Sequence, residues 1–166
     1  MKRISMLSLL LVCLASAVQL AYAQGKPSDK ENLVKVVRFL EEKPFDENAK
    51  KYREWAFLYV AETKDVSVVV CTDGIKAVME KKNKLGGEML VHYSIAMAAF
   101  KLENPTKAND EDAAQLAGVE SLLKSYEAMI KEKPKAQFAG LDDLVQKRNK
   151  GELAALLLAN NCKDKK

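Results

Sequence analysis

The chain has 166 residues, of which 48% are hydrophobic and 30% are charged, and its formal net charge is +4. This length is enough for one domain with a sizeable core. The basic residues are spread along the chain, whereas nucleic-acid and membrane-surface binders usually gather a larger positive excess on one face. Composition therefore argues against both of these classes.

The N-terminal residues 1–23 have the pattern of an export signal. Two basic residues open the chain, residues 4–25 carry no charge, and the run ends in small residues at Ala21 and Ala23. Export channels and their peptidases recognise this pattern. The sequence predicts cleavage before Gln24 and a periplasmic or secreted protein. An uncleaved anchor is one alternative, because an uncharged run of this length can also cross a bilayer. Lipid attachment at Cys13 is the other, although Val12 is bulky for the position before a lipidated cysteine.

Removal of the signal leaves a chain without a stable membrane anchor. The signal contains two of the 27 basic residues and none of the 23 acidic residues, so the net charge falls by two. The predicted organisation is a signal peptide over residues 1–23, a short tether over 24–27, an all-helical domain over 28–162 and a polar tail over 163–166.

Two cysteines, Cys71 and Cys162, remain after removal of the signal. An even pair in an oxidising compartment predicts a disulfide. It closes a loop of about 90 residues and is worth on the order of 4 kcal/mol in the chain-entropy model. Two separate buried thiols and a zinc site that includes His92 are the alternatives. The chain lacks the close ligand pairs typical of zinc sites, so we expect no metal and no cofactor.

The mature chain begins with two predicted helices. Ser28 and Glu31 have the form of a capping box, and the first helix must end before Pro44. Asp46 is predicted to cap the second helix. Each helix has one apolar face: Leu33, Val36, Val37 and Leu40 on the first, and Tyr52, Trp55, Ala56 and Tyr59 on the second.

Residues 66–71 allow two interpretations, because they are rich in valine and locally favour a strand. No other part of the chain offers a partner strand, and an isolated strand leaves its backbone groups unpaired. Asp65 can cap a helix here, although Gly74 would cost that helix about 1 kcal/mol relative to alanine. We therefore predict a helix over residues 66–78.

Residues 89–100 form the most apolar stretch of the mature chain and contain no charged side chain. A helix that is apolar around its circumference must be buried on several sides, so this is the predicted central helix. Replacement of Ile95 by aspartate should cost several kcal/mol, because an unpaired charge would enter the core. The same replacement at Lys101 should be mild, since that lysine is expected to face solvent.

The longest predicted helix follows, capped by Asn109 and ended by Pro134. Acidic residues in its first turn and lysines in its last turn complement the helix dipole. Two shorter helices are predicted over residues 141–148 and 152–160. The fold class is therefore all-α, a single domain of six to seven antiparallel helices.

No catalytic motif emerges from the chain. His92 is the only histidine, and on so apolar a helix it is predicted to be buried and bonded to a carbonyl or hydroxyl. Ser94 lies two residues away and must point elsewhere on a helix. The acidic residues 109–112 and the pair Asp142 and Asp143 lie at predicted helix starts.

These observations favour a small, exported, non-catalytic binding or scaffold protein, whose partner is an unknown protein or a small ligand. An enzyme, such as a hydrolase with an unrecognised site, and a chaperone-like or stress protein are the alternatives. A concave surface patch with clustered tyrosine, tryptophan and arginine would support binding, whereas a deep polar pocket would favour an enzyme.

Overall fold

The computed structural model describes residues 28–160, and all regular structure in this range is helical. This confirms the all-α class. The elements are α2 (Asp29–Glu42), α3 (Ala49–Glu62), the 3₁₀ helix η2 (Asp73–Met79), α4 (Gly86–Glu103), η3 (Pro105–Lys107), α5 (Glu111–Glu132), η4 (Pro134–Ala136), α6 (Ala139–Asn149) and α7 (Leu153–Ala159). The predicted signal peptide, tether and polar tail lie outside the described residues.

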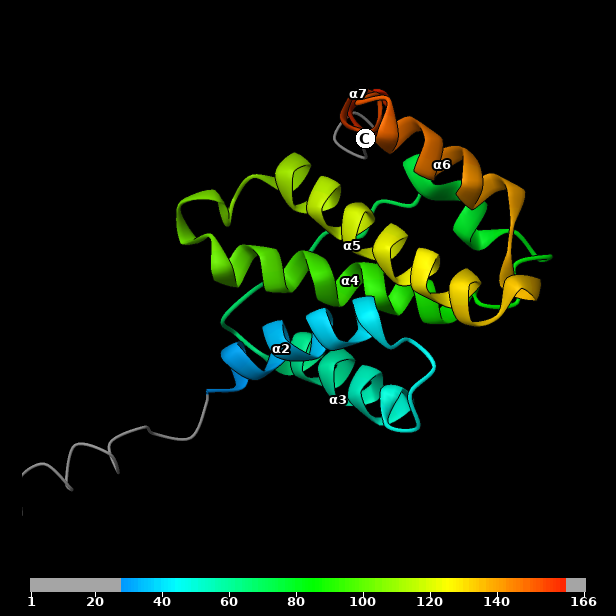
Figure 1. Ribbon diagram of the computed structural model, residues 1–166. Helices are drawn as coiled ribbons and strands as arrows, with labels where there is room; N and C mark the ends of the chain where they lie inside the picture. The colour runs from blue at the N-terminus through cyan, green and yellow to red at the C-terminus, as the bar shows by residue number, and fades with distance from the viewer. Residues whose placement is uncertain (1–27, 161–166) are drawn as a thin grey trace, which may run out of the picture.

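Helix α4 is the centre of the fold, as its uncharged sequence predicts. It packs against α2, α3, α5 and η2. Figure 1 shows α4 and α5 side by side in the middle of the molecule, with α2 and α3 on one side and α6 and α7 on the other. Every residue from 92 to 99 is buried, because α4 is covered from several directions.

The buried side chains form two clusters, and α4 contributes to both. Tyr93 and Met97 belong to the cluster that joins α4 to α5, α6, α7 and η2. Ile95 and Ala98 belong to the cluster that joins α4 to α2 and α3. One helix therefore presents different side chains to two separate groups of neighbours.

The contact between α4 and α5 is close because α5 has a glycine at the crossing. A Cβ atom on Gly118 would lie 2.6 Å from Met97 Cγ and 2.8 Å from Tyr93 Cδ2. Real Cβ atoms essentially never approach other atoms so closely. The missing side chain therefore lets the aromatic ring of α4 lie against the backbone of α5.

Of the three predicted helix N-caps, one is confirmed and two differ from the structure. Ser28 and Glu31 make both hydrogen bonds of the predicted capping box. The prediction that Asp46 caps the second helix is wrong, since Asp46 accepts a bond in the turn that precedes α3. The cap of α5 is Asp110, one residue after the predicted Asn109.

The predicted helix over residues 66–78 is wrong in its first half, where residues 66–71 form neither helix nor strand and run as an open, extended coil past α4 (Figure 1). Side chains of α4 donate hydrogen bonds to two of the segment's carbonyl groups. Lys101 Nζ donates to Ser67 O at 2.7 Å, and the Tyr93 hydroxyl donates to Cys71 O at 3.3 Å. These two hydrogen bonds stabilise the extended conformation that the valine-rich sequence favours.

Lys101 is buried, contrary to the expectation from the sequence. Its side chain is 4% exposed, and Nζ lies 2.5 Å from Glu111 Oε1 on α5. The ammonium group thus connects α4, α5 and the extended segment 66–71. The expectation that a substitution here is mild no longer has a structural basis.

Candidate ligand-binding groove

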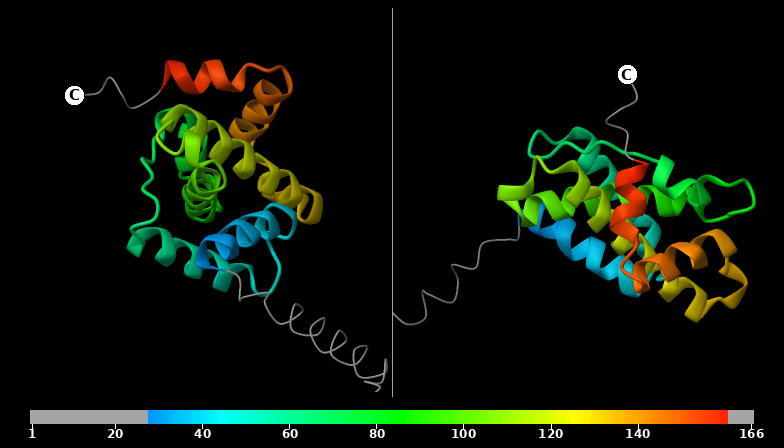
Figure 2. Two further views of the ribbon diagram at one scale, coloured as in Figure 1. Left: turned by 90° about the vertical axis from the view of Figure 1, so that its left-hand side faces the viewer. Right: turned by 90° about the horizontal axis from the view of Figure 1, so that it is seen from above.

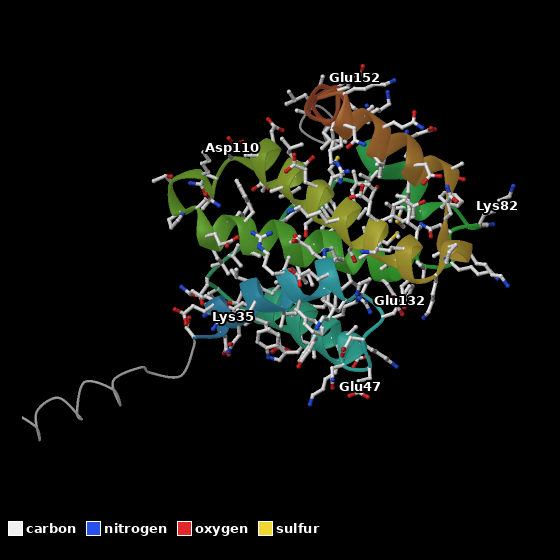
Figure 3. All side chains as sticks on the ribbon, in the orientation of Figure 1. Lys35, Glu47, Lys82, Asp110, Glu132 and Glu152 are labelled. Atoms are coloured by element: carbon white, nitrogen blue, oxygen red, sulfur yellow. The ribbon has the colours of Figure 1, made fainter. Side chains whose placement is uncertain are left out.

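An open groove of about 550 Å³ lies between α2 and α3. The inner residues of α2, such as Leu33 and Leu40, are buried in the core, so the adjacent face of the helix is left half-buried beside α3. Figure 3 labels Lys35 on this face of α2. The residues that line the groove are Asp29, Asn32, Lys35, Val36, Phe39, Lys51, Tyr52 and Trp55.

Aromatic rings from both helices form the walls of the groove. The Phe39 and Tyr52 rings meet edge to face, with centroids 5.2 Å apart and an angle of 88° between their planes. Trp55 stacks on Tyr59 at 5.8 Å with an angle of 9°. Such pairs contribute about 0.5–1.5 kcal/mol beyond their buried area. The rings are therefore held in place before any ligand arrives.

The charged side chains that line the groove are one acidic residue, Asp29, and two basic residues, Lys35 and Lys51. Lys30 Nζ lies 3.2 Å from Asp65 Oδ1, which places the start of α2 beside the end of α3. Asp29 thus belongs to one end of the groove and Lys51, near the start of α3, to the other. Within residues 28–160, Lys35 and Lys51 take part in no ion pair. Their ammonium groups remain available to an anion.

The structure places His92 away from this groove, in the core between α4 and α5. It is 1% exposed, and Nε2 lies 3.0 Å from Ser121 Oγ, as the prediction of a hydroxyl partner required. Burial, followed by the charge of Arg53, lowers the pKa of His92 to about 3. The imidazole is therefore neutral and inaccessible. Ser94 bonds instead to its own helix, through Leu90 O.

Asp142 and Cys71, two further candidates from the sequence, both have structural partners. Asp142 accepts a 2.6 Å hydrogen bond from the Tyr126 hydroxyl, which fixes the start of α6 on α5. Cys71 is 3% exposed, and its Sγ lies 3.5 Å from Asn160 O. The predicted disulfide partner Cys162, and the predicted cleavage-site residues Ala21, Ala23 and Gln24, lie outside the described residues.

Sequence reasoning missed the groove because its two walls come from different helices. The pattern placed Tyr52 and Trp55 on one helical face, but it carried no sign that Phe39 of α2 would meet Tyr52. That pairing depends on how α2 and α3 pack together. The signal that could have found it was the position of Phe39 beside the buried stripe of α2.

Neither a group of metal ligands in the described residues nor a related protein gives further evidence about this groove. In the described range, no three His, Cys, Asp or Glu side chains are grouped so that they could hold a metal ion. None of the helices between residues 28 and 160 combines the length and the hydropathy needed to cross a membrane. Comparisons with models of protein families, with curated proteins and with solved structures found no match.

Proposed function

We propose that this chain is an exported, non-catalytic binding protein, and that the groove between α2 and α3 holds a small ligand with an apolar body and one acidic group. The observation that carries the proposal is the meeting of Phe39, Tyr52 and Trp55 around one open groove. These residues form the concave aromatic patch expected of a binding site, with lysine in place of arginine.

Size and chemistry of the groove both favour binding. A volume of about 550 Å³ lies within the range of roughly 300–1,000 Å³ that is usual for small-molecule sites. An apolar ring or chain can lie against the aromatic walls, and its acidic group can reach Lys51 or Lys35. The lining includes no serine, cysteine or histidine. It therefore offers contacts for a ligand but not the serine–histidine or cysteine–histidine pair that many hydrolases use.

Export forms part of the same proposal. It is supported by the uncharged N-terminal run and by the small residues Ala21 and Ala23 before Gln24. Mass analysis of protein recovered from the cell envelope or the medium should give a mature chain that starts at Gln24. Recovery of a chain that still carries the N-terminal run and is embedded in the membrane would contradict export.

We also propose the Cys71–Cys162 disulfide and the antiparallel order of successive helices. The contact of Cys71 Sγ with Asn160 O supports the disulfide. Asn160 is the last residue that the structure describes, and it lies only two positions before Cys162 in the sequence. The ion pair of Lys30 with Asp65 supports an antiparallel α2 and α3, because it joins the start of one to the end of the other.

The test of ligand binding uses Trp55, which is the only tryptophan of the chain and lines the groove. The mature protein is titrated with anilinonaphthalene sulfonate, which has an aromatic body and one acidic group. We expect saturable quenching of the tryptophan emission with energy transfer to the probe. N-phenylnaphthylamine, the matched neutral probe, should bind more weakly because it lacks the sulfonate.

A charge-reversed variant, Lys35→Glu with Lys51→Glu, should weaken the sulfonate probe by about tenfold and leave the neutral probe nearly unchanged. The control is Lys81→Glu with Lys82→Glu, which makes the same change of charge at two exposed lysines. Figure 3 shows Lys82 on the opposite side of the molecule from Lys35. Equal weakening by both variants, or no saturable signal at all, would refute the groove as the site.

A further inference from the structure

The extended segment 66–71 is the second feature of this fold that calls for a partner. Figure 2 shows the chain between α3 and η2 as a single coil that passes beside α4. Val69 is 52% exposed and Val70 is 39% exposed. Exposed valines on an extended backbone are typical of an edge strand, which is a template for another strand.

Helix α4 occupies one edge of this segment. The carbonyls of Ser67 and Cys71 accept hydrogen bonds from Lys101 and Tyr93. Four residues of extended chain span about 13 Å, and the eight residues that separate the two donors on α4 span about 12 Å. Because Ser67 bonds to Lys101 and Cys71 bonds to the earlier Tyr93, the segment runs along α4 in the opposite direction. The matched lengths allow it to be fixed at both ends.

The opposite edge of the segment is unpaired within the described part of the chain. In an extended chain, alternate residues direct their N–H and C=O groups to the same edge. Since Ser67 and Cys71 face α4, the backbone groups of Val66, Val68 and Val70 point away from it. None of these three residues makes a backbone hydrogen bond with any other described residue.

We propose that a second copy of this chain pairs with this edge. The two segments run antiparallel with Val68 on the two-fold axis, so that Val66 of one copy is opposite Val70 of the other. All three unpaired residues are then at hydrogen-bonded positions of the ladder, and about six inter-chain bonds form. The result is an isologous dimer built on a two-stranded ribbon.

Charge and apolar surface favour a second copy as the occupant. Lys64 precedes the segment and Asp73 follows it, so an antiparallel pair brings the basic start of one segment near the acidic end of the other. No charged residue lies within residues 66–70, so no like charges oppose each other. The outward side chain of Val69 lies opposite Ser67 of the second copy and near its Val69, which removes exposed apolar surface from water.

A two-stranded ribbon by itself is marginal in water and needs an apolar surface to pack on. An apolar groove of about 330 Å³ borders the segment and supplies one. Phe57 on α3 is 48% exposed beside it. The ribbon therefore has a hydrophobic support within each copy.

The test measures the mass of the mature protein by sedimentation and light scattering from low to high micromolar concentration. We expect a monomer–dimer equilibrium. Val69→Lys should weaken the dimer by at least about tenfold, because it places two ammonium groups near the two-fold axis. Met79→Lys is the matched control, since Met79 is equally exposed, at 53%, and should leave the dimer intact. Circular dichroism checks that both variants fold.

Hydrogen exchange gives a residue-level signature that a dimer formed elsewhere would not produce. On dimerisation the amides of Val66, Val68 and Val70 should gain protection, whereas those of Ser67 and Val69 should not. A chain that stays monomeric at every concentration overturns the proposal. Protection without this alternation overturns it too, as does binding of an unrelated extended peptide at these amides by a chain that does not self-associate.

Discussion

Lys101 offers the most direct test of how this fold is held together. The substitution Lys101→Met keeps an apolar stem of similar length and removes the ammonium group. Ser67 O then loses its donor, and the carboxylate of Glu111 loses its partner. Hydrogen bonds to charged groups contribute about 1.5–3 kcal/mol each, so two lost bonds set an upper range of about 3–6 kcal/mol.

Partial solvation reduces this cost. The Glu111 side chain is 26% exposed, so water can replace part of its lost interaction, whereas the ammonium of Lys101 is almost fully buried. We therefore expect Lys101→Met to lower the free energy of unfolding by about 3 kcal/mol. In the double variant that adds Glu111→Gln, the second change should cost less than it does alone, because no buried carboxylate is left unpaired.

Urea denaturation with an unchanged slope measures these differences. The control is Lys107→Met, an exposed lysine whose substitution should stay within about 0.5 kcal/mol. A cost below about 1 kcal/mol for Lys101→Met would refute the claim that this lysine connects α4, α5 and the extended segment.

Three further predictions concern the core and the cysteines. The pKa of His92 falls from 6.5 to about 3 on folding, so between these pH values the unfolded chain binds one more proton than the folded chain. The free energy of unfolding therefore decreases as the pH falls below about 6.5, with a slope that approaches 1.4 kcal/mol per pH unit. His92→Gln should flatten this slope between about pH 6.5 and pH 5 in denaturation curves, and an unchanged slope would show that other groups cause it. Gly118→Val should lower the unfolding free energy by about 2–3 kcal/mol, because its side chain would overlap Met97; a neutral effect on the melting temperature would show that α4 and α5 can separate at little cost. Thiol titration of the denatured mature chain without reductant should find Cys71 and Cys162 blocked, and reduction should lower the melting temperature; two reactive thiols would remove the disulfide.

Local signals in the sequence were sufficient for much of the fold. The capping box of Ser28 and Glu31 acts within four residues, and the uncharged run 89–100 implies burial whatever its neighbours are. Both are confirmed. The two C-terminal helices were also predicted within about two residues of their observed ends.

Features that depend on distant residues could not be predicted in this way. The extended form of residues 66–71 is stabilised by donors from α4, and a sequence pattern does not show that Lys101 turns inward to supply one of them. Likewise, a charged residue directly after an apolar run normally marks the solvated face of a helix. The groove is similar, because Phe39 and Tyr52 become neighbours only when α2 and α3 pack.

The division of the core into two clusters has a consequence for motion. Helices α2 and α3 pack on a face of α4 that combines Ile95 with the small side chains of Ala96, Ala98 and Ala99, whereas the larger Tyr93 and Met97 face the other cluster. The alanines lose little buried area when the helix pair shifts by a small distance. Because the Phe39–Tyr52 ring pair joins α2 to α3, such a shift moves both walls of the groove together and keeps the ring pair intact.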